Sequence, residues 1–204
     1  MQSYILEQAT DFLCELDGDW AKLISEIGPC TFALKAEREP YEALVRAVAY
    51  QQLNTKSGDA IIKKFISYFN ETFPPPAQLL SAEFDALRTC GFSGRKIETI
   101  QGIARGAIDG LVPTLVQANT MSDEALIEQL VALKGIGRWT VEMMLMFTLG
   151  RKDILPVDDF GVREGYKRLK YLETAPTPKT LAKIGEAWQP YRTIASWYLW
   201  RVPK

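Results

Sequence analysis

The sequence predicts an all-α fold, and two observations support this fold class. Apolar residues recur at the 3.6-residue spacing of amphipathic helices along much of the chain, for example over 41–69. Only residues 29–36 (PCTFALKA) resemble a strand, and neither an alternating strand series nor a repeat of roughly 20–50 residues accompanies them. Hydrophobic residues make up 47% of the 204 residues, so a sizeable core can form without disulfides or a structural metal.

The first helices can be placed from their periodicity and from the breaks between them. Residues 41–50 (YEALVRAVAY) are expected to form one helix, and after a short break a second helix begins at Thr55 or Ser57. Three consecutive prolines, 74–76, predict a loop after this second helix. The apolar face of the second helix comprises Ile61, Ile62, Phe65, Ile66 and Phe69.

Two later helices have clear N-terminal signals. Ser122 precedes Asp123 and Glu124, which is typical of an N-cap followed by an acidic first turn. Thr177 precedes Pro178, which is typical of a cap followed by proline at the first helical position. We therefore expect helices to begin directly after Ser122 and after Thr177.

The charge balance and the absence of histidine exclude several classes of protein. Lys and Arg number 24 and Asp and Glu number 25, so the chain is not a polycation that coats nucleic acid, although a local basic face is compatible with a net charge of −1. Without histidine there can be no Ser-His-Asp or Cys-His nucleophile pair, no zinc site with histidine ligands and no histidine general base. Catalysis must use carboxylates, lysines, thiols, hydroxyls or backbone dipoles.

The cysteines and the distribution of charge indicate the compartment. Cys14, Cys30 and Cys90 are widely spaced, which favours buried thiols in a reducing compartment and excludes an iron–sulfur cluster ligated by four cysteines of this chain. Glu7 and Asp11 interrupt the first apolar stretch, and no uncharged run reaches the ~20 residues that span a bilayer. We expect a soluble intracellular protein without a membrane partner, either cytoplasmic or nucleoid-associated, or nuclear in a eukaryote.

The stretch LKGIGRWT, residues 133–140, predicts a tight turn between two helices. One helix is expected to end near Leu133, Gly135 and Gly137 allow positive φ in the turn, and the next helix begins at about Gly137. The first N–H groups of that helix suit an anion such as a DNA phosphate. A GxG alone more often marks a plain helix–helix turn, but Leu133 and Ile136 as apolar anchors favour the DNA-binding interpretation.

Basic residues surround this hairpin in the sequence. Lys134 and Arg138 flank the turn, and Arg151 and Lys152 follow the second helix, while Glu142 is the single acid in this part of the chain. The local field is therefore expected to be positive although the whole chain is nearly neutral.

Together with three further motifs, the hairpin resembles the helix–hairpin–helix DNA glycosylase superfamily, and among its branches the AlkA-type 3-methyladenine DNA glycosylase II. The further motifs are the loop 154–163 (ILPVDDFGVR), the tail 188–200 and the stretch 51–53 (QQL). They occur in the family's order, and the resemblance covers roughly residues 40–201.

The resemblance implies a helix–hairpin–helix glycosylase fold with two helical lobes and an active-site cleft between them. We expect one lobe to comprise about 1–35 with 170–204, and the other about 36–169 with the hairpin 133–140. The implied activity belongs to base excision repair: a damaged nucleotide is flipped out of duplex DNA and its N-glycosidic bond is hydrolysed.

The loop 154–163 supplies the implied catalytic carboxylate. Breaking the bond creates positive charge on the deoxyribose, which a carboxylate stabilises. Asp159 aligns with the branch's catalytic aspartate, whereas alignment on the Val-Asp pair of other branches selects Asp158. Both aspartates could instead simply cap the following helix. The position where bifunctional members carry a Schiff-base lysine is Trp139, so we expect a monofunctional enzyme that leaves an abasic site.

The resemblance also implies a base pocket. Alkylated purines such as 3-methyladenine and 7-methylguanine are cationic, so stacking on aromatic rings gains cation–π attraction. The pocket positions are Trp139, Met143, Phe160 and Trp200. Met143 replaces a tyrosine of the branch, which leaves the range of lesions open, and Trp200 could equally be ordinary core packing.

The remaining implied contacts involve DNA and a cation. Leu53, with Gln52, is the expected wedge that fills the gap left by the flipped nucleotide, although a small buried contact is the alternative for Leu53. The expected phosphate contacts are Gly135, Gly137, Lys134, Arg138 and Thr140. The backbone carbonyls of Val131, Leu133 and Ile136 match positions that hold a monovalent cation, Na⁺ or K⁺, and no catalytic cofactor or metal is expected.

The expected partner is double-stranded DNA containing alkylated bases, bound by a monomer. Two competing functions stay open from the sequence. One is a glycosylase of the same superfamily for another damaged base, and the other is a non-catalytic DNA-binding protein. The aspartate loop argues against the second, because a carboxylate facing DNA repels phosphate and a simple clip has no use for it.

Overall fold

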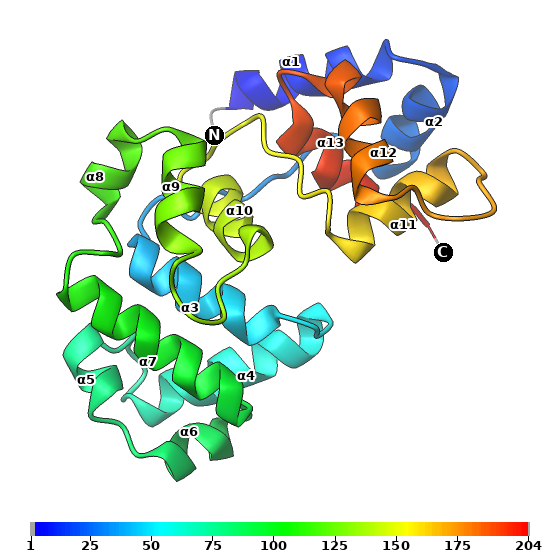
Figure 1. The fold of residues 1–204 in the computed structure, drawn as a ribbon. Coiled ribbons are helices and arrows are strands. Elements are labelled where there is room, and N and C mark those ends of the chain that lie inside the picture. Colours follow the sequence, from blue (N-terminus) through cyan, green and yellow to red (C-terminus); the bar gives the residue numbers. More distant parts are fainter. Residues whose placement is uncertain (1–2, 204) are drawn as a thin grey trace. The chain divides into compact units, whose positions relative to one another are not determined.

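The computed structural model describes residues 3–203, and all regular structure in this range is helical (Figure 1). The predicted all-α class is therefore confirmed. Residues 29–36, the one candidate strand, form no strand. A backbone bond from this stretch joins the Lys35 N–H to the Phe147 carbonyl at 2.8 Å. No helix in the described range is long and apolar enough to cross a bilayer.

The chain divides into two compact units. The first combines Met1–Leu34 with Gly150–Lys204, and the second is Lys35–Leu149. The sequence placed 150–169 in the lobe of the hairpin, whereas the structure groups this segment with the chain ends. The physical reason is that the helix beginning at Phe160 packs against two helices formed by the ends.

The first unit contains five α-helices and a short 3₁₀ helix in its described residues. They are α1 (Ser3–Cys14), α2 (Gly18–Ile27), α11 (Phe160–Leu169), α12 (Pro178–Ile184), η1 (Gly185–Trp188) and α13 (Arg192–Leu199). Leu13, Trp20 and Tyr198 are among its fully buried side chains. α11 packs against α2 and α13, and at Gly165 the two helices α11 and α13 approach so closely that a Cβ atom would overlap the Leu199 carbonyl.

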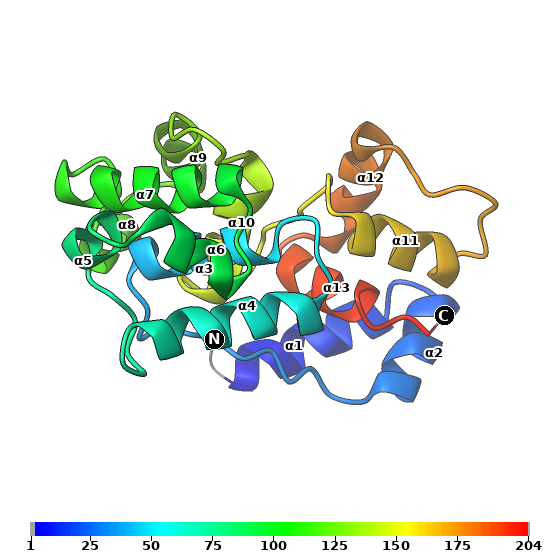
Figure 2. The ribbon, with the colours of Figure 1, turned by 90° about the horizontal axis from the view of Figure 1, so that it is seen from below.

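The second unit is built around α7, which packs against α3 and α5 (Figures 1 and 2). Its helices are α3 (Pro40–Tyr50), α4 (Thr55–Tyr68), α5 (Pro76–Leu80), α6 (Phe84–Cys90), α7 (Gly94–Ile108), α8 (Leu115–Thr120), α9 (Asp123–Leu130) and α10 (Arg138–Phe147). An aromatic cluster centres on Phe65, whose ring lies 5.0–5.6 Å from those of Phe69, Phe73 and Phe92.

The capping signals place the helix starts correctly. α4 begins at Thr55, because the Asn54 side chain accepts the Ser57 N–H at 2.9 Å. The predicted caps Ser122 and Thr177 open α9 and α12. Within the predicted loop 74–76, however, the third proline is the first residue of α5, a position where its missing N–H removes no helical hydrogen bond.

The contact at Gly165 predicts a large cost for one added methyl group. Gly165→Ala should lower the free energy of unfolding by about 1–3 kcal/mol, because the Leu199 backbone has to move. The measurement is the urea unfolding midpoint. Gly102→Ala in α7, where a Cβ meets nothing within 4 Å, is the control and should be neutral or stabilising. Equal midpoints for the two variants would contradict this account of the packing.

Candidate functional site

Asp159 is held by two donors in the first unit. It is the N-cap of α11, and its Oδ1 accepts the Val162 N–H at 2.8 Å and the Trp200 Nε1–H at 2.8 Å. Asp159 is half-buried, whereas Asp158 is exposed. The capping alternative is thus confirmed for Asp159, and the second donor shows that its carboxylate is oriented by more than the cap.

Gly161 leaves the space in which this contact forms. A Cβ atom at Gly161 would lie 2.8 Å from Cδ1 and 3.1 Å from Nε1 of Trp200, and 3.1 Å from Asp159 Oδ1. The sequence interpretation missed this glycine, because the ring that demands the space comes from a residue distant in the chain. A glycine in the first turn of a helix carries no signal of such a contact.

The loop before Asp159 is fastened to the N-terminal end of α13. Arg192 donates from Nε to Asp153 Oδ1 at 2.7 Å and from Nη2 to Oδ2 at 2.9 Å. The buried Thr193 hydroxyl donates to the Arg151 carbonyl at 2.7 Å and accepts the Ile154 N–H at 3.0 Å. Since Trp200 caps the other end of α13, this one helix holds the aspartate loop at two places. Asp153 and Thr193 were not singled out in the sequence.

In the second unit, the hairpin is a non-helical turn between α9 and α10. α9 ends at Leu130 instead of near Leu133, because Leu133 and Ile136 donate their N–H groups three residues back, to Leu130 and Leu133. α10 begins at Arg138 with Gly137 as its N-cap, and no side chain caps it there. The buried Ile136 anchors the turn as predicted.

The two hairpin glycines have different roles. Gly135 has φ +84°, and a Cβ atom there would overlap the Thr99 hydroxyl, so both the conformation and the space require glycine. Gly137 has φ −100°, and a Cβ atom there would meet nothing within 4 Å. The predicted positive φ is therefore right for Gly135 and wrong for Gly137.

The turn between α3 and α4 exposes the predicted wedge. Leu53 is 43% exposed, which contradicts the alternative of a buried contact, and the preceding Gln52 is exposed with φ +58°. Lys96 of α7 donates to the carbonyls of Ala49 at 3.0 Å and Gln51 at 2.9 Å, and burial lowers the pKa of its ammonium group. This lysine caps the C-terminal end of α3 directly before the wedge.

Gln51 joins the wedge turn to the hairpin. Its Nε2 donates to the Thr140 hydroxyl at 2.9 Å and to the Gly135 carbonyl at 3.3 Å. α7 contacts both elements, since Lys96 donates to the wedge turn and the Thr99 side chain packs against Gly135. The wedge and the hairpin are therefore one connected structure.

Comparisons with known proteins place the chain in a family. The model of the HhH-GPD superfamily of base excision DNA repair proteins matches residues 45–190. The chain belongs to this superfamily. It is 44% identical over 201 residues to DNA-3-methyladenine glycosylase 1 of Schizosaccharomyces pombe, an alignment that covers 98% of this chain and 88% of that protein.

Solved structures of the superfamily resemble the whole fold. The S. pombe 3-methyladenine DNA glycosylase (Mag1) in complex with abasic DNA has a TM-score of 0.91 at 44% identity, covering 95% of each chain. A DNA-3-methyladenine glycosidase from Bacillus halodurans has a TM-score of 0.77 at 33% identity, covering 95% of this chain and 88% of its own.

In this member of the superfamily, the two basic residues that flank the hairpin turn, Lys134 and Arg138, are paired with carboxylates. The Arg138 guanidinium donates to Glu124 at 2.8 and 3.2 Å and to Glu142 at 3.0 Å, and the bonds to Glu124 above all raise the pKa of Arg138. Lys134 pairs with Glu98 at 2.9 Å. Glu98 and Glu124 lie outside the stretch on which the prediction was based, which is why sequence proximity missed them.

Thr140 and the cation carbonyls differ in how well they fit their expected roles. Thr140 is 1% exposed and accepts the Gln51 bond, so its hydroxyl does not face solvent as a phosphate ligand would. Val131, Leu133 and Ile136 lie in or beside a non-helical turn, and the Leu133 carbonyl accepts the Ile136 N–H at 3.0 Å. Among residues 3–203, no group of His, Cys, Asp or Glu could hold a metal.

The predicted pocket residues divide between the units. Trp139 and Met143 are half-buried and four residues apart on α10, so they lie on the same side of that helix. In the first unit, Phe160 is 75% exposed and Trp200 is half-buried, with its ring against Gly161.

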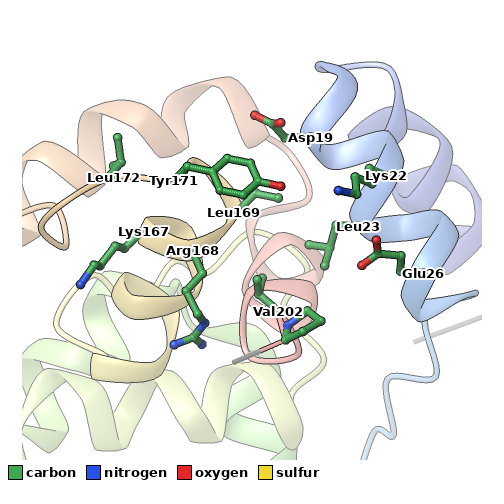
Figure 3. Close-up of a pocket in the computed structure, with 11 residues that line it drawn as sticks. Asp19, Lys22, Leu23, Glu26, Lys167, Arg168, Leu169, Tyr171, Leu172 and Val202 are labelled. Carbon is green, nitrogen blue, oxygen red and sulfur yellow. The ribbon is translucent and has the colours of Figure 1, made fainter.

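A cavity of about 390 Å³ in the first unit is a separate feature (Figure 3). Residues of α2, the end of α11 and the chain after α13 line it, with Tyr171 and Leu169 facing Leu23. None of Asp159, Phe160 and Trp200 belongs to its lining.

The different surroundings of the two hairpin glycines predict different outcomes for Gly→Ala. Gly137→Ala should leave the melting temperature unchanged and weaken binding to duplex DNA of any sequence about tenfold, because the methyl group meets only the incoming phosphate. Gly135→Ala should lower both stability and affinity, because it disturbs the turn itself. Unchanged DNA affinity in Gly137→Ala would remove the start of α10 from the DNA interface.

Proposed function

We propose that this protein is a monofunctional DNA glycosylase that hydrolyses the N-glycosidic bond of alkylated purines, such as 3-methyladenine and 7-methylguanine, in duplex DNA. The observation that carries the proposal is the oriented, half-buried carboxylate of Asp159 in a member of a base excision repair superfamily. A relative of 44% identity named DNA-3-methyladenine glycosylase 1 supports the choice of substrate.

In the proposed reaction, Asp159 stabilises charge on the sugar. The C1′–N bond breaks, its electron pair leaves with the base, and a cationic alkylated base departs neutral. Positive charge then develops on the deoxyribose, and the fixed carboxylate offsets it. Water adds to C1′ and loses a proton, which leaves an abasic site. Asp158, exposed and next to the cap, has no such fixed orientation in this scheme.

The absence of lyase chemistry is also proposed. Trp139 stands where a bifunctional member carries its Schiff-base lysine, and an indole cannot form an imine with the sugar. The nearby Lys134 amine is engaged by Glu98. No catalytic cofactor takes part, and a monovalent cation, Na⁺ or K⁺, is assigned only to the hairpin carbonyls as an aid to DNA binding.

The protein is proposed to bind DNA as a monomer, chiefly through backbone groups. The N–H groups at the start of α10 meet a phosphate, since the side chain of Arg138 is already bound by two carboxylates. Leu53 fills the space that the flipped nucleotide leaves, and Trp139 and Met143 contact the extruded base.

The proposal is tested with alkylated duplex DNA. The wild-type protein should release 7-methylguanine without nicking the strand, and borohydride should trap no covalent complex. Asp159→Asn should lower the rate by about 10²–10³-fold or more while DNA binding persists, because the amide lacks the negative charge that stabilises the positively charged transition state. Asp158→Asn is the matched comparison and should lose far less. Binding without base release would indicate the non-catalytic alternative, and trapping would show lyase activity.

The exposure of Leu53 predicts a substrate-dependent effect of its truncation. Leu53→Ala should slow excision most when the lesion is well paired, and much less opposite a mismatch, because a weakly paired base is easier to extrude. The measurement is the single-turnover rate on both duplexes at matched melting temperature. If both rates fall equally, Leu53 positions the site and is not a wedge.

A further inference from the structure

Trp200 contacts the carboxylate of Asp159 through the indole N–H, the only polar group of the Trp200 side chain. The indole N–H donates to Oδ1 at 2.8 Å, and the Val162 N–H donates to the same oxygen at the same distance. Hydrogen bonds to a charged acceptor are short and directional, so two of them on one oxygen define the orientation of the carboxylate. One of the two comes from the backbone of α11 and the other from a side chain of another helix end.

The indole is itself held in place. Trp200 is the C-cap of α13, and its backbone N–H donates to the Ser196 carbonyl at 3.0 Å. Its ring lies against Gly161, where any side chain would come within 2.8 Å of Cδ1. A fixed helix end on one side and a glycine on the other thus determine where the N–H points.

We propose that Trp200 is a positioning residue for Asp159 and acts on excision through that carboxylate. This inference rests on the proposed function. A stacking residue contributes to binding of the base, whereas a residue that orients the carboxylate contributes when charge develops on the sugar. The two roles therefore differ in whether substitution changes binding or the chemical step.

The first test replaces the indole by a ring that cannot donate. Trp200→Phe should lower the single-turnover rate of 7-methylguanine release about 10- to 100-fold. The dissociation constants for lesion DNA and abasic DNA should stay within about twofold. An unchanged rate, or a weakening of lesion binding by the same factor as the rate, would overturn the positioning role.

A second variant keeps both functional groups and removes only the space between the helices. Gly161→Ala should displace the indole and lower the rate in the same way as Trp200→Phe, whereas Gly102→Ala, also a helical glycine but in open surroundings, should not. If Gly161 acts through the Trp200 bond, Gly161→Ala should add little in the Trp200→Phe background. Full additivity, at unchanged melting temperature, would contradict the shared mechanism.

A third measurement is independent of activity. In a ¹⁵N-labelled protein, the indole resonance that disappears in Trp200→Phe should shift in Asp159→Ala and stay in place in Asp158→Ala. If the Trp200 indole resonance does not shift in Asp159→Ala, the inference is wrong even if the enzyme is active. A responsive indole in a protein that releases no alkylated base shows instead that the proposed function has failed while the contact is real.

Discussion

The close approach of α11 to α13 is the constraint on which the first unit depends. Gly161 and Gly165 are four residues apart, so they lie on one face of α11, and both face α13. The Leu199 backbone packs against Gly165, and the ring of the next residue, Trp200, packs against Gly161. A larger residue at either position would push the two helices apart. It would thereby also move the Asp159 carboxylate away from the Trp200 indole N–H.

Features with a local cause were predicted well from the sequence. The helix class, the caps at Ser122 and Thr177, the start of α4 at Thr55 and the turn at Gly135 all follow from residues within a few positions of each other. The exposed wedge and the capping role of Asp159 belong to the same group, since each follows from a helix boundary.

Features that depend on residues distant in the chain were missed. Glu98 of α7 and Glu124 of α9 pair with Lys134 and Arg138 of the hairpin. Arg192 and Thr193, some forty residues later, fasten the aspartate loop at Asp153 and Ile154. The boundary of the units at Gly150 was misplaced for the same reason. No composition or periodicity reports which helices touch, so these partners come only from the three-dimensional structure.

The Gln51 bridge gives the proposed DNA-binding surface a kinetic property. Because the bonds from Gln51 to the hairpin and from Lys96 to the wedge turn lie within the protein, both elements are held in place by its own residues. Preorganised surfaces lose less conformational entropy on association and need no folding step. In the proposed function, the second unit therefore meets duplex DNA with both elements already in position, and the rearrangement on base flipping is that of the nucleic acid.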